Sequence, residues 1–64
     1  MGSSGIYEGI YEYNPKYVKV FKIEATTVME ARKIAEAFLK KNRLGKLVKI
    51  VYLWPKDVED RLQK

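Results

Sequence analysis

Paired carboxylates are the first side chains in this sequence that could do chemistry, because two of them can act together as general acid and base. Glu8 and Glu12 alternate with apolar residues near the start of the chain. Four residues along a strand span about 13 Å, whereas the two carboxylates of a glycosidase lie about 5–9.5 Å apart. We therefore expect no acid–base pair from these two glutamates.

Other signatures of catalysis and metal binding are lacking in the sequence. The chain has no histidine and no cysteine, which removes the usual zinc ligands and the usual general base at neutral pH. Gly9 and Gly45 stand alone, so the sequence contains no glycine-rich phosphate loop. These features predict a protein that is not an enzyme and that holds no cofactor and no metal ion.

Aromatic residues that alternate with lysines form the one combination that indicates a ligand. Single-stranded nucleic acid binds such surfaces because its bases stack on aromatic rings while its phosphates contact ammonium groups. Rings at an interface between subunits would give the same pattern, and lysines at a helix end also complement the helix dipole. The candidate nucleic-acid-binding residues are Lys16, Lys22, Lys40, Lys41, Arg43, Lys46, Tyr13 and Tyr17.

The net charge of the 64-residue chain is +5, and it is unevenly distributed. Residues 14–56 contain eleven Lys or Arg side chains against three glutamates, a balance of +8, whereas residues 1–13 carry −2 and residues 57–64 carry −1. A basic central segment favours acidic partners such as DNA or RNA. A charge of this size is also ordinary for a soluble small domain.

The length allows one domain only, and a core of this size leaves stability marginal without further support. Because no disulfide can form, association with a second copy is the remaining means of stabilisation. Residues 1–5, MGSSG, read as a flexible linker remnant, so the predicted domain comprises residues 6–64. No apolar run reaches the roughly 18 residues that a membrane span needs, and we expect a cytoplasmic protein without a membrane partner.

A β-hairpin is predicted at the start of the domain. Residues 6–13 and 17–25 are rich in Ile, Val and Tyr with partial alternation, which is typical of strands. Asn14, Pro15 and Lys16 lie between them. The proline favours a turn because it fixes its own backbone angle and cannot donate a ladder hydrogen bond.

A long helix is predicted next. Thr27 and Glu30, three residues later, have the pattern of a capping box. Apolar residues then recur at helical spacing, which places the helix at about residues 27–43. Gly45 suits the left-handed backbone conformation that often ends a helix.

The remaining elements complete an α+β fold. Residues 46–54 form a third strand, and Pro55 ends that strand and can begin a short helix over residues 56–62. The predicted order is ββαβ with a short C-terminal helix: a three-stranded, mostly antiparallel sheet with one long helix on one face. The third strand pairs either with the second in parallel or with the first in antiparallel fashion, and we favour the arrangement with the first strand in the centre.

The register of the hairpin decides which side chains lie beneath the helix, because a slip of one residue moves every side chain to the other face. If Tyr13 lies opposite Val18, the aliphatic residues lie under the helix and the tyrosines lie on the open face. If Tyr13 lies opposite Tyr17, Gly9 faces Phe21 and the tyrosines share a face with Phe21. We select the first register.

An open sheet face with this many apolar side chains exceeds what a monomer usually exposes, and strands apolar on both faces are usually covered on both. The sequence therefore predicts a homodimer, formed through the aromatic sheet face or an edge strand. The one intramolecular alternative is a cover made by Val58 and Leu62 of the C-terminal helix. The predicted interface residues are Tyr7, Tyr11, Val18, Val20, Val48, Ile50, Tyr52 and Trp54.

Two functions remain open at the level of sequence. The first is a small, non-catalytic and homodimeric binding module whose basic surface suits DNA or RNA. The second is a protein–protein interaction or structural assembly module with no role in nucleic-acid binding.

Overall fold

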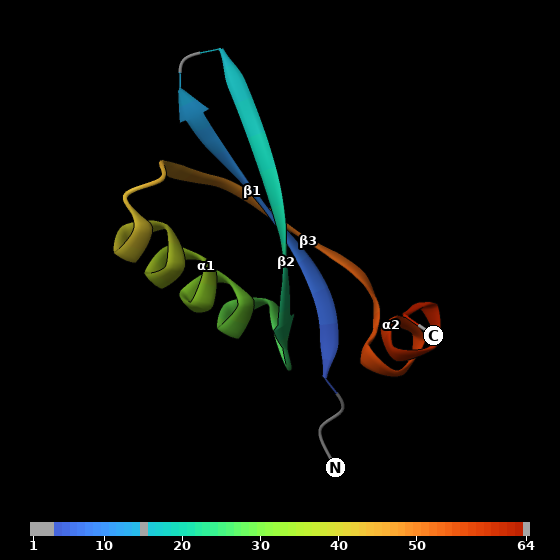
Figure 1. The fold of residues 1–64 in the computed structure, drawn as a ribbon. Coiled ribbons are helices and arrows are strands. Elements are labelled where there is room, and N and C mark those ends of the chain that lie inside the picture. The colour runs from blue at the N-terminus through green and yellow to red at the C-terminus, as the bar shows by residue number, and fades with distance from the viewer. Residues whose placement is uncertain (1–3, 15, 64) are drawn as a thin grey trace.

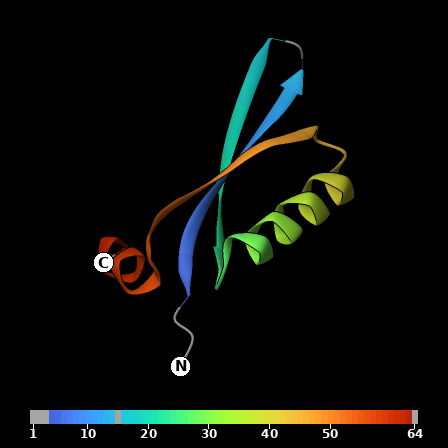
Figure 2. The same cartoon turned by 180° about the vertical axis from the view of Figure 1, so that it is seen from behind.

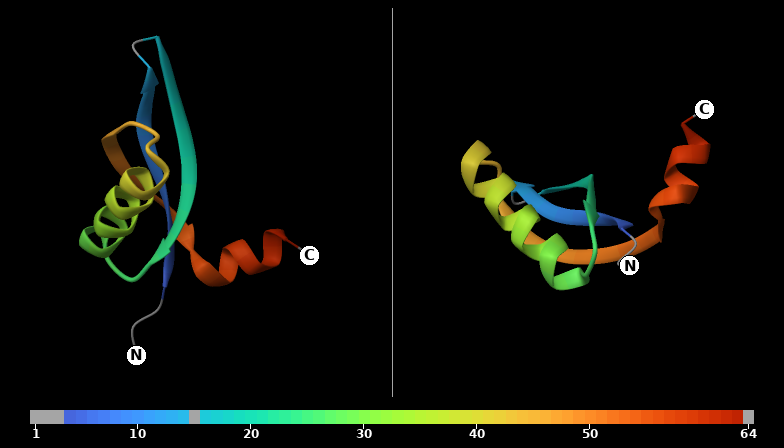
Figure 3. Two further views of the ribbon diagram at one scale, coloured as in Figure 1. Left: turned by 60° about the vertical axis from the view of Figure 1, so that its left-hand side comes forward. Right: turned by 90° about the horizontal axis from the view of Figure 1, so that it is seen from below.

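A computed structural model describes residues 4–14 and 16–63 of the chain. It contains a three-stranded antiparallel sheet with a long helix on one face and a short helix near one end of the other face (Figures 1 and 3). The predicted α+β class and the order ββαβ with a C-terminal helix are confirmed. The elements are β1 (Gly5–Asn14), β2 (Tyr17–Ala25), α1 (Val28–Asn42), β3 (Lys46–Pro55) and α2 (Lys56–Leu62).

The strand order is β2-β1-β3, and β1 pairs with both neighbours in antiparallel fashion. The prediction that the first strand is central is therefore confirmed. Helix α1 carries the chain from β2 at one edge of the sheet to β3 at the other, as Figures 1 and 2 show from the two sides. Both β2 and β3 are edge strands as a result.

The selected hairpin register is wrong. Gly9 lies opposite Phe21 and Glu12 lies opposite Val18, as in the register that we rejected. The pairing shifts only near the turn, between Glu12 and Asn14. A Cβ atom on Gly9 would lie 2.9 Å from the Phe21 ring, so the glycine leaves the space that the ring occupies.

This register places tyrosines, rather than aliphatic residues, beneath α1. The buried core combines Tyr7 and Ile23 of the sheet with Ala25 and with Ala31 and Ala35 of the helix. Ala31 and Ala35 are completely buried and let the helix come close to the sheet, and the space beside them is filled by rings. Phe21 continues this aromatic layer, since its ring centroid lies 5.7 Å from that of Tyr11 and 4.8 Å from that of Phe38.

The start of α1 confirms Thr27 as the helix cap, but the return bond of the predicted capping box goes to Thr26 instead of Thr27. The hydroxyl of Thr27 accepts a hydrogen bond from the backbone N–H of Glu30 at 3.1 Å. The Glu30 carboxylate accepts in return from the backbone N–H and the hydroxyl of Thr26, at 2.8 and 3.1 Å. The helix begins at Val28, because the backbone of Thr27 is still in an extended conformation.

The end of α1 differs from the prediction. Arg43, with φ 52°, takes the left-handed conformation, and its N–H donates to the carbonyls of Leu39 and Lys40. Gly45 does not have a positive φ. It is needed for a different reason, because a Cβ there would lie 1.8 Å from the carbonyl oxygen of Glu12.

The folded part of the chain begins before residue 6. Gly5 is buried in β1, and the Ser4 carbonyl accepts a hydrogen bond from the N–H of Lys56 at 3.0 Å. The predicted linker remnant therefore does not include these two residues; Met1, Gly2 and Ser3 lie outside the described residues. The predicted turn is supported by the side-chain oxygen of Asn14, which accepts from the N–H of Lys16 at 2.9 Å, while Pro15 lies outside the described residues.

Candidate nucleic-acid interface

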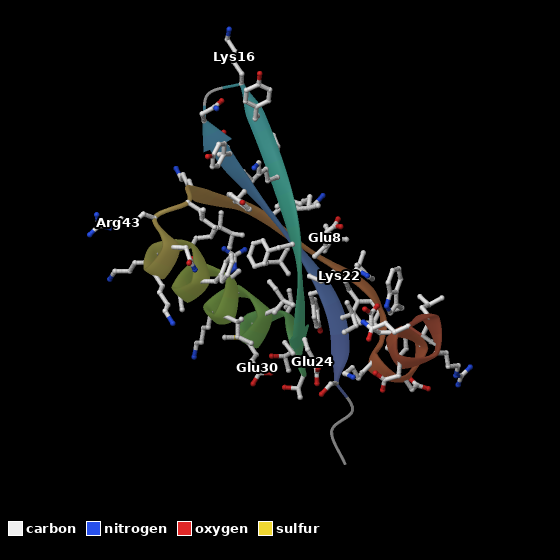
Figure 4. The ribbon with its side chains drawn as sticks, in the orientation of Figure 1. Glu8, Lys16, Lys22, Glu24, Glu30 and Arg43 are labelled. Carbon is white, nitrogen blue, oxygen red and sulfur yellow. The ribbon has the colours of Figure 1, made fainter. Side chains whose placement is uncertain are left out.

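The β1–β2 hairpin extends beyond the rest of the fold. Strand β3 begins its pairing with β1 at Lys46, opposite Glu12, whereas β1 and β2 continue to the pair of Asn14 and Tyr17. The two strands thus project past β3 and α1, with Lys16 at the tip (Figures 1 and 4). We call this end of the hairpin the hairpin arm. It comprises the projecting residues Tyr13, Asn14, Lys16 and Tyr17, together with Val18 and Lys19, which follow on β2 at the level of the first pairs of β3.

Two tyrosines and two lysines of the arm face solvent. The exposed fractions are 48% for Tyr13 and 61% for Tyr17. The amine of Lys19 lies over the Tyr13 ring, 4.3 Å from its centroid, a cation–π contact that holds the two side chains side by side. The backbone N–H of Lys16 donates to the side-chain oxygen of Asn14, and the Lys16 side chain is exposed. The arm therefore presents aromatic rings and ammonium groups together.

A second basic group lies where α1 ends and β3 begins. The left-handed Arg43 ends the helix abruptly, and Figure 4 shows its side chain extending away from the fold. Lys40 and Lys41 occupy the last turn of α1, and Lys46 begins β3. We call these four side chains the helix-end cluster. Their exposed positions place four positive charges within seven residues of sequence.

The arm and the helix-end cluster belong to the same end of the molecule. Lys46 lies opposite Glu12, the residue that precedes Tyr13 of the arm, and Gly45 contacts the Glu12 backbone closely. Beside them is a hollow of about 380 Å³ between α1 and the start of β3. Its lining residues are Arg32, Glu36, Leu39, Lys40, Gly45, Lys46 and Leu47.

The ion pairs of the described residues all lie away from this basic end. Glu59 pairs with Lys22 at 3.4 Å, Asp57 pairs with Arg61 at 3.4 Å, and Lys56 pairs with both Glu24 and Asp60. The hydrogen bond from Lys56 to Asp60 raises the pKa of Lys56. Within residues 4–14 and 16–63, no cation of the arm or of the helix-end cluster has a carboxylate partner.

A carboxylate holds α2 against the open face of the sheet. Glu59 is only 7% exposed, and it accepts hydrogen bonds from the indole N–H of Trp54 at 2.8 Å and from the amide of Gln63 at 2.8 Å. The bond from Trp54 is the largest cause that lowers the pKa of Glu59, and Lys22 adds to it. The amine of Lys22 also lies 5.1 Å from the centre of the Trp54 ring.

The structure brings together seven of the eight predicted nucleic-acid-binding residues. Tyr13, Lys16 and Tyr17 lie on the arm, and the other four form the helix-end cluster. Lys22 is the exception, because it binds Glu59 far from the arm. The sequence prediction missed Lys19, since its contact with Tyr13 follows from the hairpin register, and its alternation with Tyr17 was the only signal.

The predicted aromatic open face does not form. Tyr7 and Tyr11 are buried beneath α1, Ile50 contacts the core, and Trp54 is half-buried beside α2. Because the register is the rejected one, the tyrosines lie on the helix side of the sheet. Four predicted interface residues do face solvent, but they divide between the two edge strands: Val18 and Val20 of β2, and Val48 and Tyr52 of β3.

Helix α2 covers part of the open face, as the intramolecular alternative proposed. Its Val58 is half-buried, and beneath the helix Ile6 is only 5% exposed. Leu62, in contrast, is 63% exposed and contributes little. The remainder of the open face alternates apolar and charged residues, such as Val20 and Lys22, and is ordinary for a solvated sheet.

Within the described part of the chain, no group of three or more acidic side chains could hold a metal ion. None of the helices in residues 4–14 and 16–63 is long and apolar enough to cross a membrane. No family model, no curated protein and no solved structure matches this sequence or fold.

Proposed function

We propose that this protein is a non-catalytic module that binds nucleic acid through its basic end, the hairpin arm together with the helix-end cluster. The observation that carries the proposal is the separation of charge. The ion pairs of residues 4–14 and 16–63 lie at the α2 end. Within the same residues, the cations of the arm and of the helix-end cluster have no carboxylate partner. A cation without an internal partner binds an external phosphate without breaking an existing ion pair.

The shape of the arm favours duplex DNA as the ligand. A two-stranded β-ribbon fits the major groove of B-DNA, which is about 12 Å wide, whereas the major groove of duplex RNA is too narrow for protein side chains. In this arrangement the arm enters the groove and the helix-end cluster contacts the neighbouring phosphates. Stacking of single-stranded bases across the sheet is disfavoured, since Tyr7 and Tyr11 are buried.

A protein-interaction module is the second candidate function. It is favoured by the apolar side chains Val18 and Val20, which are 61% and 56% exposed on an edge strand. Val18 belongs to the hairpin arm, whereas the helix-end cluster lies on a separate element. A protein partner on both valines would therefore compete with DNA for the arm but not for the cluster. For either function we expect a cytoplasmic protein.

The salt dependence of DNA affinity tests the first proposal. Six cations belong to the arm and the cluster, and each phosphate contact on B-DNA contributes about −0.9 to the slope of log K against log salt. If four to six contacts form, the affinity for a 20-base-pair duplex falls on the order of 10²- to 10³-fold between 50 and 200 mM salt. Fluorescence anisotropy of a labelled duplex measures this slope.

Matched triple variants locate the binding surface. Changing Lys40, Lys41 and Arg43 to glutamine should flatten the slope by about 2.7. The control changes Lys33, Lys56 and Arg61 to glutamine, which removes the same charge from other parts of the surface and should leave the slope unchanged. Absence of binding, a salt-independent affinity, or equal slopes for the two triple variants would each show that the basic end is not the binding surface.

A further inference from the structure

The outer edge of β2 carries a concentration of exposed apolar side chains. Val18 and Val20 lie on the open face of this strand. On the other face, Phe38 of α1 stacks on Phe21 of β2 and is still 41% exposed. Ile34 precedes Phe38 by one helical turn and is also 41% exposed, so α1 presents an apolar stripe on its β2 side.

The two edges of the sheet differ in regularity. Strand β2 pairs with β1 in unbroken register from Ala25 to Val18. Strand β3 shifts its register against β1 twice, once near Tyr52 and once near Leu47. Bulges of this kind obstruct the addition of another strand to an edge. Between Val18 and Ala25, β2 has no such irregularity; the one shift in its pairing lies at Tyr17, where the extra residue is Tyr13 of β1. No described element pairs with the outer side of β2.

The charges along β2 make this edge complementary to itself. Lys16 comes immediately before the first residue of β2, and Glu24 is the next-to-last residue of the strand. The acidic end is reinforced by Glu30, whose carboxylate is held against Thr26. Figure 4 shows Lys16 at one end of the molecule and Glu24 and Glu30 at the other. An antiparallel copy of the strand would therefore place unlike charges side by side at both ends.

We propose that a second copy of this chain pairs with β2 in antiparallel fashion, which forms a continuous six-stranded sheet in the order β3-β1-β2-β2-β1-β3. A two-fold axis at Val20 places Lys16 of each copy beside Glu24 of the other, and it sets no like charges directly opposite. An axis at Lys22 would instead oppose two ammonium groups. In the proposed dimer the α1 stripes, Ile34 and Phe38, meet across the axis.

This dimer forms without DNA and leaves the helix-end cluster exposed. It takes up the outer edge of β2, including Tyr17 and Val18 of the hairpin arm, and places Lys16 beside Glu24 of the other copy. The arm is therefore free to enter a DNA groove only in the monomer. The antiparallel arrangement directs the two hairpin arms toward opposite ends of the assembly. Its interface combines backbone hydrogen bonds along the edge with apolar contacts on both faces, which is the mode of β-strand addition. Of the two dimer interfaces that the sequence suggested, the sheet face and an edge strand, this proposal selects the edge strand β2.

Solution mass tests the proposal with two variants that are closely matched. Val20 on β2 and Val48 on β3 are the same residue type, and both are 56% exposed. We expect light scattering to give twice the mass of one chain for the wild type and for Val48→Lys, and the mass of one chain for Val20→Lys. A monomeric wild type, or an equal loss of mass in the two variants, would overturn the proposal.

A disulfide test covers the case in which Val20→Lys fails to fold. The chain contains no cysteine, so a single introduced thiol can cross-link only to another copy. Val20→Cys should form a disulfide-linked dimer under mild oxidation, because cross-strand neighbours at a two-fold axis have the Cα separation that a disulfide needs. Val48→Cys should remain a monomer on a non-reducing gel. Equal cross-linking of the two variants would contradict the assignment to β2.

Discussion

Replacing Gly45 with alanine tests how closely β3 approaches β1 at the base of the hairpin arm. The new Cβ would lie 1.8 Å from the carbonyl oxygen of Glu12 and 2.9 Å from its carbonyl carbon. Both atoms belong to the backbone, so neither can rotate away. Real Cβ contacts essentially never fall below 3.0 Å, which is 1.2 Å more than the 1.8 Å contact. The two strands must therefore separate locally by at least 1.2 Å.

This displacement is large compared with a hydrogen bond. A backbone bond of about 2.9 Å would lengthen to roughly 4 Å, so the pairing of Glu12 with Lys46 would open. Loss of two ladder bonds at about 1 kcal/mol each, with loosened packing of Leu47 on Tyr11, amounts to about 2–4 kcal/mol. A chain of this size has a total stability of roughly 3–10 kcal/mol, so the variant should lose a large part of it.

Thermal unfolding followed by far-UV circular dichroism measures the effect. At about 4–8 °C per kcal/mol for a domain of this size, the melting temperature of Gly45→Ala should fall by roughly 10–25 °C. The matched control is Gly9→Ala, whose Cβ meets the ends of side chains instead: Phe21 ring carbons at 2.9 and 3.0 Å and the Ile23 terminal methyl at 3.2 Å. These can rotate, so the control should lose much less stability.

The comparison cancels the effect of alanine on the unfolded chain, which stabilises both variants by about 0.4–1 kcal/mol. The difference between the two melting temperatures therefore reports what each Cβ meets in the folded state. A Gly45→Ala protein that melts within about 3 °C of the wild type, or that is more stable than Gly9→Ala, would refute the close approach of β3 to β1.

Two further predictions concern α2 and the core. The hydrogen bond from Trp54 lowers the pKa of Glu59 below its ordinary value of 4.5, so the stability that this carboxylate adds is present above pH 4.5 and is lost as the pH falls through the lowered pKa. The fluorescence emission of Trp54, the only tryptophan, should shift to the red over that range. A transition that persists unchanged in Glu59→Gln would exclude the mechanism. Leu39 is 3% exposed, and Leu39→Ala should lower the free energy of unfolding by about 2–4 kcal/mol. Met29 is 69% exposed, and Met29→Ala should change that free energy by no more than about 0.5 kcal/mol. Equal midpoints of urea unfolding for the two variants would contradict the burial of Leu39 in the core.

The helices and strands are readable from the sequence because their signals are local. The pattern of Thr27 and Glu30 marks the start of α1, and Pro55 marks the start of α2. Alternating β-branched and aromatic residues mark the strands to within one residue of their bounds. The central position of β1 was also predicted correctly. The bounds of the elements depend on residues that are near one another in the chain, whereas the central position of β1 depends on its pairing with the distant β3.

The register of the hairpin required the tertiary structure. Both registers offer plausible cross-strand pairs, so the sequence of the two strands alone does not distinguish them. The deciding contacts come from α1, whose fully buried Ala31 and Ala35 bring the helix close to the sheet and whose Phe38 stacks on Phe21. Phe21 in turn needs the open space at Gly9. These distant contacts place the tyrosines beneath α1.

The candidate site divides in the same way. The helix-end cluster could be predicted from sequence as a basic group because its members are neighbours in the chain and lie at the end of one helix: Lys40, Lys41, Arg43 and Lys46. The structure places Lys22 and Trp54 beside Glu59, away from the basic end, and the sequence did not indicate this because it depends on the docking of α2. The sequence by itself determined the elements and the basic segment, and it favoured the central strand over one alternative. Which face is buried, which cations remain unpaired and which edge is regular were decided by side-chain packing between elements far apart in the chain.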